Sequence, residues 1–261
     1  MGEYWSLFTT LSGSLAFHQL NLILLTEKLS WLSLRADDRR AVHIREVLKA
    51  KNGDEVDLGV RNGPRGKGKV KLHAEGGIEL QVNWLPQHHN DLYPISLIVG
   101  VSRPQTCRKI LDQATSMGVK EIFFFLADKS KSSYIQSSLW QTDEWMRKIE
   151  AGVEQAFGTF VPKCSHFDSL EEILDQLVLR KTTRFIVLDN YESKHALKAD
   201  WLLGENSDLV MFVGPERGWS NEERSKLKSY KCKFFHLGSR VLRVETAIVA
   251  ALGVLTSSLQ N

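Results

Sequence analysis

From residue 95 onward, short apolar runs alternate with segments of helical periodicity, and this alternation constrains the fold more than any other feature. Expected strands cover residues 95–101, 122–126, 185–188, 209–213 and 234–237, and expected helices cover 107–117, 142–157, 170–179, 221–230 and 244–257. Uninterrupted apolar strands that alternate with amphipathic helices are typical of a mostly parallel sheet covered on both faces. We therefore predict an α/β fold for this part of the chain.

The chain before residue 94 has a different pattern. Apolar runs at 20–25, 56–60, 69–72 and 78–84 are separated by the turn signals Asn52-Gly53, Asn62-Gly63-Pro64 and Gly76-Gly77. One helix is expected at 38–50, with Val42, Ile44, Val47 and Leu48 on one side. These features predict a small β-rich barrel.

Two of the six prolines, Pro86 and Pro94, frame a polar stretch typical of a linker. The predicted organisation is an N-terminal extension at 1–18, a β-barrel domain at 19–88 and an α/β domain at 92–261. The extension has no Lys or Arg before Lys28, which argues against a signal peptide and a mitochondrial presequence.

The net charge, the cysteines and the length of the apolar runs exclude only a few classes of protein. The net charge of +3 permits a nucleic-acid partner without arguing for one. Cys107, Cys164 and Cys232 form no CxxC pair, so neither a disulfide framework nor a metal site is expected, and a reducing, cytoplasmic location is predicted. Because no apolar run approaches the roughly 20 residues that span a bilayer, no membrane partner is expected.

Three loops that follow predicted strands are candidates for a ligand site: residues 188–190, 214–220 and 237–246. Ligands of open α/β sheets bind beyond the carboxyl ends of the strands. Gly214 and Gly218 allow the backbone to approach a ligand closely, and Ser220 with Glu223 forms the pattern of a capping box. The alternative is that these are plain turns. The dinucleotide fingerprint and the P-loop are both absent.

Basic residues cluster in the N-terminal part. One group lies in the glycine-rich sequence RNGPRGKGKVK and another in and around the helix expected at 38–50. Such clusters favour contact with a phosphate backbone, although a solvated hairpin tip is the alternative. The candidates for RNA binding are Arg39, Arg45, Arg61, Arg65, Lys67 and Lys69.

The second and third loops carry a specific resemblance. GPERGWSNEE and LGSRVLRVETA resemble two motifs of the ribosomal RNA small subunit methyltransferase E family, in the expected order. HIREVLKAKNGDEVDLG, SRPQTCRKILDQATSMGVKEI and GVEQAFGTFVP resemble further stretches of that family, so the likeness covers most of residues 20–258. The family methylates N3 of a uridine in small-subunit ribosomal RNA, and the resemblance implies this activity here.

The resemblance also implies an architecture. It predicts a SPOUT-type parallel sheet domain with a C-terminal trefoil knot, preceded by a PUA-like β-barrel, and a homodimer formed through the knotted domain. S-adenosylmethionine would lie in the knot, with ribosomal RNA or the small ribosomal subunit as the partner. The residues implied to hold the cofactor are Leu188, Val213, Gly214, Pro215, Glu216, Gly218, Leu237, Gly238, Val241, Leu242, Arg243 and Thr246.

Two residues are candidates for catalysis. Methylation of uridine N3 requires loss of a weakly acidic proton, so a cation near the uracil oxygens would stabilise the anion. Arg243 is predicted to supply that cation, with Glu245 as a base or an orienting partner. The alternative is that both are structural, because an acidic residue in the first turn of a helix favours the helix dipole.

Three departures from the family pattern leave other functions open. Arg217 stands where the family usually has glycine, Gly158 replaces a polar residue, and residues 127–137 match a basic stretch only loosely. The alternatives are a SPOUT methyltransferase of another RNA or atom, and a catalytically silent RNA-binding assembly protein. A nucleotide-binding oxidoreductase is disfavoured by the missing glycine fingerprint.

Overall fold

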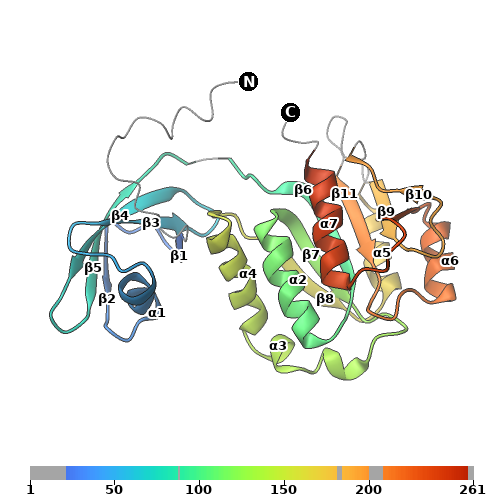
Figure 1. Cartoon of the computed structure of the whole chain (residues 1–261), viewed down its shortest axis with the longest axis horizontal. Helices are drawn as coiled ribbons and strands as arrows, with labels where there is room; N and C mark the ends of the chain where they lie inside the picture. The colour runs from blue at the N-terminus through green and yellow to red at the C-terminus, as the bar shows by residue number, and fades with distance from the viewer. Residues whose placement is uncertain (1–21, 88, 181–183, 200–207, 258–261) are drawn as a thin grey trace.

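The computed structural model describes residues 22–87, 89–180, 184–199 and 208–257 (Figure 1). The predicted N-terminal extension at 1–18 lies outside these ranges, as do the first two residues of the strand expected at 20–25. Two sheets lie side by side, joined by the segment that leaves β5 and enters β6 (Figure 1).

The N-terminal part is a five-stranded sheet in the order β1-β3-β4-β5-β2. Strand β1 runs parallel to β3, and the other neighbours are antiparallel. The strands are β1 (Ile23–Leu25), β2 (Trp31–Leu34), β3 (Glu55–Val60), β4 (Arg65–Leu72) and β5 (Ile78–Trp84). Apolar side chains from all of them, including Ile23, Leu34, Leu58, Val70 and Leu80, form one buried cluster. The predicted β-rich character of this part is confirmed.

The helix expected at 38–50 is present, but it is shorter and irregular. The structure has one turn of α-helix, α1 (Arg39–Val42), followed by a π-helical turn, η2 (His43–Val47). The wider turn changes which side chains face the sheet. Ile44 is buried as expected, but Val47 is 44% exposed. The α-helical period of 3.6 residues predicted Val47 on the buried side of the helix, but the wider π-helical turn leaves it in solvent.

The C-terminal part is a seven-stranded sheet in the order β10-β12-β9-β11-β6-β7-β8, and every neighbouring pair is parallel. Its strands are β6 (Tyr93–Gly100), β7 (Val119–Phe125), β8 (Lys163–Phe167), β9 (Arg184–Leu188), β10 (His195–Ala196), β11 (Leu209–Val213) and β12 (Lys233–His236). The predicted parallel α/β sheet is confirmed.

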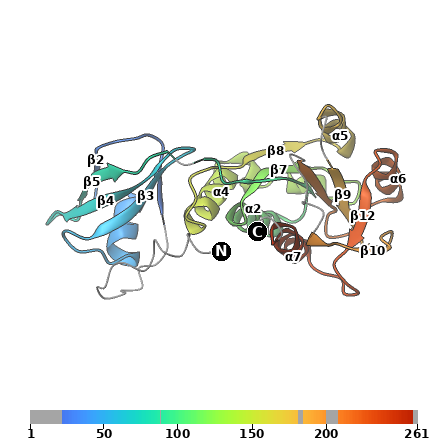
Figure 2. The same ribbon diagram turned by 90° about the horizontal axis from the view of Figure 1, so that it is seen from above.

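Helices cover both faces of this sheet (Figure 2). On one face pack α2 (Pro104–Ser116), α4 (Glu144–Gln155) and α7 (Val244–Thr256), and on the other α5 (Leu170–Val178) and α6 (Asn221–Ser229). The short α3 (Ser138–Gln141) and the 3-10 turn η3 (Ser132–Tyr134) precede α4. Leu97 and Val99 of β6 face the first layer and Ile98 faces the second, so each strand contributes to two cores.

The two parts are joined by hydrogen bonds as well as by the chain. Glu154 of α4 accepts a hydrogen bond from the Leu24 backbone N–H at 3.0 Å. Asn62 donates its backbone N–H to the Thr159 carbonyl at 2.8 Å, and its side chain accepts from the Val161 N–H at 2.9 Å. These contacts hold the first sheet against α4 and the segment that follows it.

Cys107, Cys164 and Cys232 are free thiols. Burial raises the pKa of Cys107 to about 12, so this thiol is a packing group. Within the described ranges, no three His, Cys, Asp or Glu side chains group closely enough to hold a metal ion. No helix in those ranges combines the length and the apolar character needed to cross a membrane.

Candidate functional site

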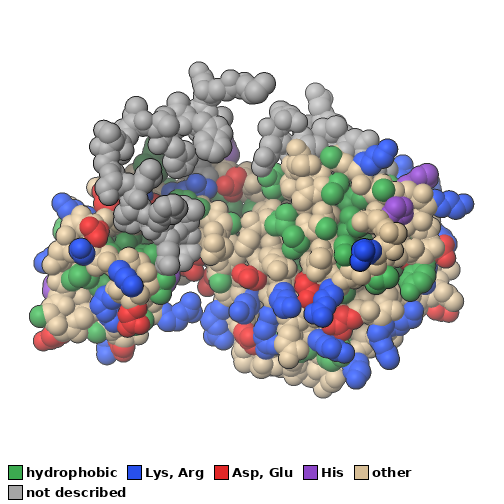
Figure 3. All heavy atoms as spheres, in the orientation of Figure 1, with side chains coloured by type: hydrophobic (Ala, Val, Ile, Leu, Met, Phe, Trp, Pro, Cys, Tyr) green, Lys and Arg blue, Asp and Glu red, His purple; other side chains and the backbone are tan. Residues whose placement is uncertain are grey.

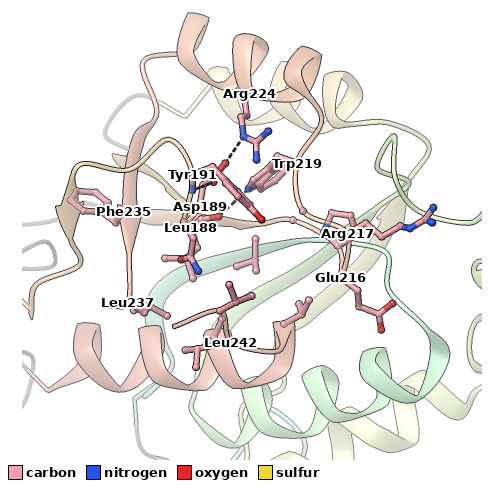
Figure 4. Close-up of a pocket in the computed structure, with 18 of the residues that line it drawn as sticks. Leu188, Asp189, Tyr191, Glu216, Arg217, Trp219, Arg224, Phe235, Leu237 and Leu242 are labelled. Atoms are coloured by element: carbon pink, nitrogen blue, oxygen red, sulfur yellow. Dashed lines mark hydrogen bonds and ion pairs between the residues drawn. The ribbon is translucent and has the colours of Figure 1, made fainter. Parts of the chain in front are cut away.

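A pocket lies at the carboxyl ends of β9, β11 and β12, where the three predicted loops meet (Figure 4). Strand register brings the loops together, because Leu188 at the end of β9 pairs with Val213 of β11 and with Phe235 of β12. Among the residues predicted to hold a cofactor, the pocket is lined by Leu188, Val213, Gly214, Pro215, Glu216, Gly218, Leu237, Val241 and Leu242.

The loop at 214–220 is held in a tight turn that leads into α6. The Gly218 N–H donates to the Pro215 carbonyl at 2.8 Å, and Gly218 has a φ of +70°, a conformation that favours glycine. The predicted capping box is present: the Ser220 hydroxyl accepts from the Glu223 N–H at 3.0 Å, and the Glu223 carboxylate accepts from the Ser220 N–H at 2.8 Å. Burial raises the pKa of Glu223.

Trp219 ties two of the loops together. Its Nε1–H donates to the Leu188 carbonyl at 3.0 Å, and its ring stacks on Phe125 with centroids 6.0 Å apart. The side chain is buried, and a Cβ on Gly214 would lie 3.2 Å from its ring. The Lys129 ammonium group donates a hydrogen bond to the Trp219 carbonyl at 2.7 Å. Trp219 was not predicted as a site residue, although its place directly after Gly218 in the loop was visible in the sequence.

A second cluster at the pocket joins the β9 loop to α6. The Asp189 carboxylate is buried and accepts from Arg224 Nε at 2.6 Å through one oxygen. Through the other oxygen it accepts from the Tyr191 N–H at 2.7 Å. The Arg224 guanidinium lies over the Tyr191 ring, 5.5 Å from its centroid. Sequence reasoning missed Arg224 and Tyr191, because only the tertiary fold brings α6 beside the loop.

The Glu216 and Arg217 side chains lie at the edge of the pocket. Glu216 accepts a hydrogen bond from the Thr106 hydroxyl at 2.9 Å and lies 3.7 Å from Arg103 Nε, which links the loop to the start of α2. Arg217 is exposed, and Figure 4 shows its guanidinium directed away from the pocket. The arginine in place of the family's usual glycine therefore does not fill the pocket.

The predicted catalytic residues lie just beyond this lining. Arg243 is the exposed N-cap residue of α7, and its carbonyl accepts from the Ala247 N–H at 2.8 Å. Glu245 in the first turn of α7 is 9% exposed, and its carboxylate lies 3.2 Å from the Lys109 ammonium of α2. Gly238, Arg243 and Thr246 are not among the residues that line the pocket. Lys109 was not predicted.

The basic residues predicted to bind RNA in the N-terminal part differ in their contacts and exposure. Arg45 donates to the backbone carbonyls of Ala36, at 3.0 Å, and Gly76, so it braces the sheet. Arg61, Arg65 and Lys67 form ion pairs with Glu150, Asp91 and Asp57, respectively. Arg39 and Lys69 are exposed, and Lys69 lies on the outer face of β4.

Comparison with known proteins identifies relatives over most of the chain. Residues 88–256 match a family model described as an RNA methyltransferase domain. The chain is 29% identical over 224 residues to ribosomal RNA small subunit methyltransferase E of Treponema pallidum, covering 85% of this chain and 84% of that protein. It is 24% identical over 242 residues to ribosomal RNA small subunit methyltransferase E 1 of Borreliella burgdorferi, covering 93% and 100%.

A solved structure shares the fold. It is a ribosomal RNA small subunit methyltransferase E from Neisseria gonorrhoeae bound to S-adenosyl methionine, similar with a TM-score of 0.73 at 20% sequence identity. The match covers 91% of this chain and 97% of that one, so both sheets belong to the shared arrangement.

Proposed function

This chain belongs to the RNA methyltransferase domain family, as a relative of the ribosomal RNA small subunit methyltransferase E proteins, and on that premise we propose that it methylates N3 of a uridine in small-subunit ribosomal RNA. The methyl donor is S-adenosylmethionine. The observation that carries the proposal is the pocket formed where the 188–190, 214–220 and 237–246 loops meet at the carboxyl ends of adjacent parallel strands.

The pocket residues suit this cofactor. Leu188, Val213 and Leu242 offer apolar surface for an adenine ring, and backbone groups of Leu237, Val241 and Leu242 are the proposed contacts for its polar edge. A Cβ on Gly218 would meet no protein atom within 4 Å, so the backbone there borders open space. When bound, S-adenosylmethionine supplies an electrophilic methyl group on a sulfonium. The full set proposed to hold it is Leu188, Val213, Gly214, Pro215, Glu216, Gly218, Leu237, Gly238, Val241, Leu242, Arg243 and Thr246.

Arg243 is the proposed catalytic cation. It is exposed at the start of α7, directly after Leu242 of the pocket, and we assign its guanidinium to the oxygens of the uracil ring. Stabilising the developing uracil anion lowers the barrier to losing the N3 proton. Glu245 is already paired with Lys109, which favours an orienting role for it over that of a base. The pair fixes the first turn of α7 and with it the position of Arg243.

The surfaces outside the pocket suit RNA and a second copy of the chain. Residues 19–88 are proposed as a PUA-like RNA-binding domain, and residues 92–261 as the SPOUT domain with a C-terminal trefoil knot. The exposed Arg39 and Lys69 are the foremost candidates for RNA contact, and Arg45, Arg61, Arg65 and Lys67, which also make contacts within the protein, are the further candidates. A homodimer through α7 is supported by this helix's composition, since Val249, Ala250 and Val254 are only half-buried and hydrophobic side chains are exposed around it (Figure 3). A ribosomal substrate fits a cytoplasmic location.

The role of Arg243 can be tested with methyl-labelled S-adenosylmethionine and small ribosomal subunits that lack the modification. We expect the wild-type protein to transfer label to RNA and Arg243→Ala to lower kcat by about 100-fold, the typical effect of removing one anion-stabilising donor. Arg243→Lys keeps a cation and should recover part of that loss. Transfer by Arg243→Ala at the wild-type kcat would exclude the proposed role.

A further inference from the structure

We propose that Tyr191 is a stacking platform for the uracil base of the RNA substrate at the mouth of the pocket. The inference rests on the proposed function, because it assigns a residue that would present the target base to the methyl donor. Tyr191 follows the end of β9 and lines the pocket, yet its side chain is 82% exposed. Figure 4 shows Tyr191 and Arg224 on one side of the pocket and Leu237 and Leu242 on the opposite side.

The backbone of Tyr191 is held, and one face of its ring is contacted, before any ligand binds. Its backbone N–H is bound by the buried Asp189 carboxylate at 2.7 Å. The next residue, Glu192, forms an ion pair of 2.7 Å with Lys228 of α6. Arg224, fixed by Asp189, presents its guanidinium to the ring at 5.5 Å. A rigid ring loses little conformational entropy when a ligand stacks on it.

Burial in the core does not account for the position of the Tyr191 ring. An aromatic side chain that stabilises the fold buries most of its surface, whereas Tyr191 leaves 82% of its surface in solvent. Three charged contacts nevertheless fix the loop and one face of the ring, while the remainder of the ring is open. Single-stranded RNA is recognised in this way, by stacking unstacked bases on exposed aromatic rings.

The position of Tyr191 favours the RNA base over the cofactor as the stacking partner. The apolar floor of the pocket comes from side chains such as Leu188, Val213 and Phe235, which lie at the ends of the strands. Tyr191 also lines the pocket but is exposed to solvent, as are Arg217 and Arg240. Arg240 is exposed, and Arg217 directs its guanidinium outward from the pocket edge (Figure 4), so both suit the phosphates of an RNA strand that approaches from solvent, because guanidinium groups bind phosphate strongly.

The test is the affinity for RNA of two Tyr191 variants. The probe is fluorescein-labelled single-stranded oligouridylate, measured by anisotropy with saturating S-adenosylhomocysteine, whose own Kd is measured by calorimetry. We expect Tyr191→Ala to raise the Kd for RNA about ten-fold and Tyr191→Phe, which keeps the ring, to change it by less than about twofold. Both should leave the Kd for S-adenosylhomocysteine unchanged. Leu179→Ala, 80% exposed and beyond the opposite end of β9, is the matched control and should leave both affinities unchanged.

Two results would overturn the platform: an unchanged Kd for RNA in Tyr191→Ala, or a loss of S-adenosylhomocysteine affinity as large as the loss of RNA affinity. Methyl transfer by the wild-type protein is measured in parallel. If the wild-type protein transfers methyl groups but Tyr191→Ala binds RNA with an unchanged Kd, the platform is refuted and the proposed function stands. An RNA affinity that depends on the ring, without transfer to any RNA, supports the platform and refutes the proposed function.

Discussion

Gly218 illustrates how a single residue type determines the shape of the pocket. Its φ of +70° is strained for any residue with a Cβ, and the space beside it is open. Gly53, in the turn that precedes β3, has a φ of +89° and equally open surroundings, but it lies in the N-terminal part. The two glycines therefore share a backbone requirement and differ in their proximity to the pocket.

Gly218→Ala should weaken cofactor binding while Gly53→Ala should not. Each change costs about 1–2 kcal/mol of unfolding free energy, because an L-residue is strained in the left-handed region. Only the Cβ at position 218 would extend into space bordered by the 214–220 loop, and we expect it to raise the Kd for S-adenosylhomocysteine about ten-fold. Calorimetric titration and urea denaturation of both variants provide the measurements. Equal Kd values for the two variants would show that the pocket does not use this loop.

The sequence predicted which loops meet but not which side chains join them. The 188–190, 214–220 and 237–246 loops were identifiable because each follows an apolar run and two carry glycines. Arg224 and Lys109 come from α6 and α2, and their partners Asp189 and Glu245 lie 35 and 136 residues away in the chain. The periodicity of one segment carries no information about an ion pair with a segment so far away in the chain. These contacts could therefore be identified only from the three-dimensional structure.

At the scale of elements, burial decided which strands were predictable. The strands β6, β7 and β11 are almost wholly buried and produce continuous apolar runs. The strand β8 lies at the edge of its sheet and exposes Lys163, Ser165 and His166, so no such run appears. The strand β2 is also an edge strand with mostly exposed or half-buried residues, and β10 has only two residues. All three were missed for that reason.

A buried ion pair links three elements at the other end of the sheet. Glu121 of β7 accepts from Ser96 of β6 at 2.5 Å and from Arg180 after α5 at 2.6 Å. Burial alone would raise the pKa of Glu121, but the hydrogen bonds from Arg180 and Ser96 outweigh it and lower the pKa below the usual 4.5. The carboxylate form therefore stabilises the fold above pH 4.5, and this stabilisation disappears as the pH falls through the lowered pKa.

Glu121→Gln should reduce the free energy of unfolding by about 1–3 kcal/mol at neutral pH, because Arg180 loses its charged partner. The difference between wild type and variant should shrink as the pH falls below 4.5 and the wild-type carboxylate becomes protonated. Urea denaturation across that range measures it. Glu79→Gln, which removes a surface ion pair with Lys71, should change stability little at any pH. A difference at Glu121 that is independent of pH would contradict the assignment.

At the scale of the whole molecule, α7 bears on the oligomeric state. Its buried Ile248, Leu252 and Leu255 belong to the core cluster that also contains side chains of α2, while Gly253 on its outer side is exposed, with no atom within 4 Å of a built Cβ. A helix that is apolar on its solvent side as well as its packed side is typical of an interface. This is the physical support for the proposed homodimer.

Gly253→Arg should convert the proposed dimer to a monomer without unfolding the subunit. Arginine has a higher helix propensity than glycine, so the isolated subunit should be no less stable, while a buried unpaired charge would disrupt a dimer interface. Light scattering after gel filtration gives the mass, and Ser229→Arg on α6, at the opposite face of the sheet, is the control expected to stay dimeric. A wild-type monomer, or a dimeric Gly253→Arg variant, would refute the proposed interface.

The identity of the modified nucleoside tests most directly whether the pocket directs a methyl group to N3 of a uridine in small-subunit ribosomal RNA. Small ribosomal subunits from cells that lack the modification are incubated with the protein and labelled S-adenosylmethionine, and the RNA is digested to nucleosides and separated. We expect the label in 3-methyluridine. Label in any other nucleoside would contradict the proposed function. So would the absence of label in the RNA when the protein is shown to bind the cofactor.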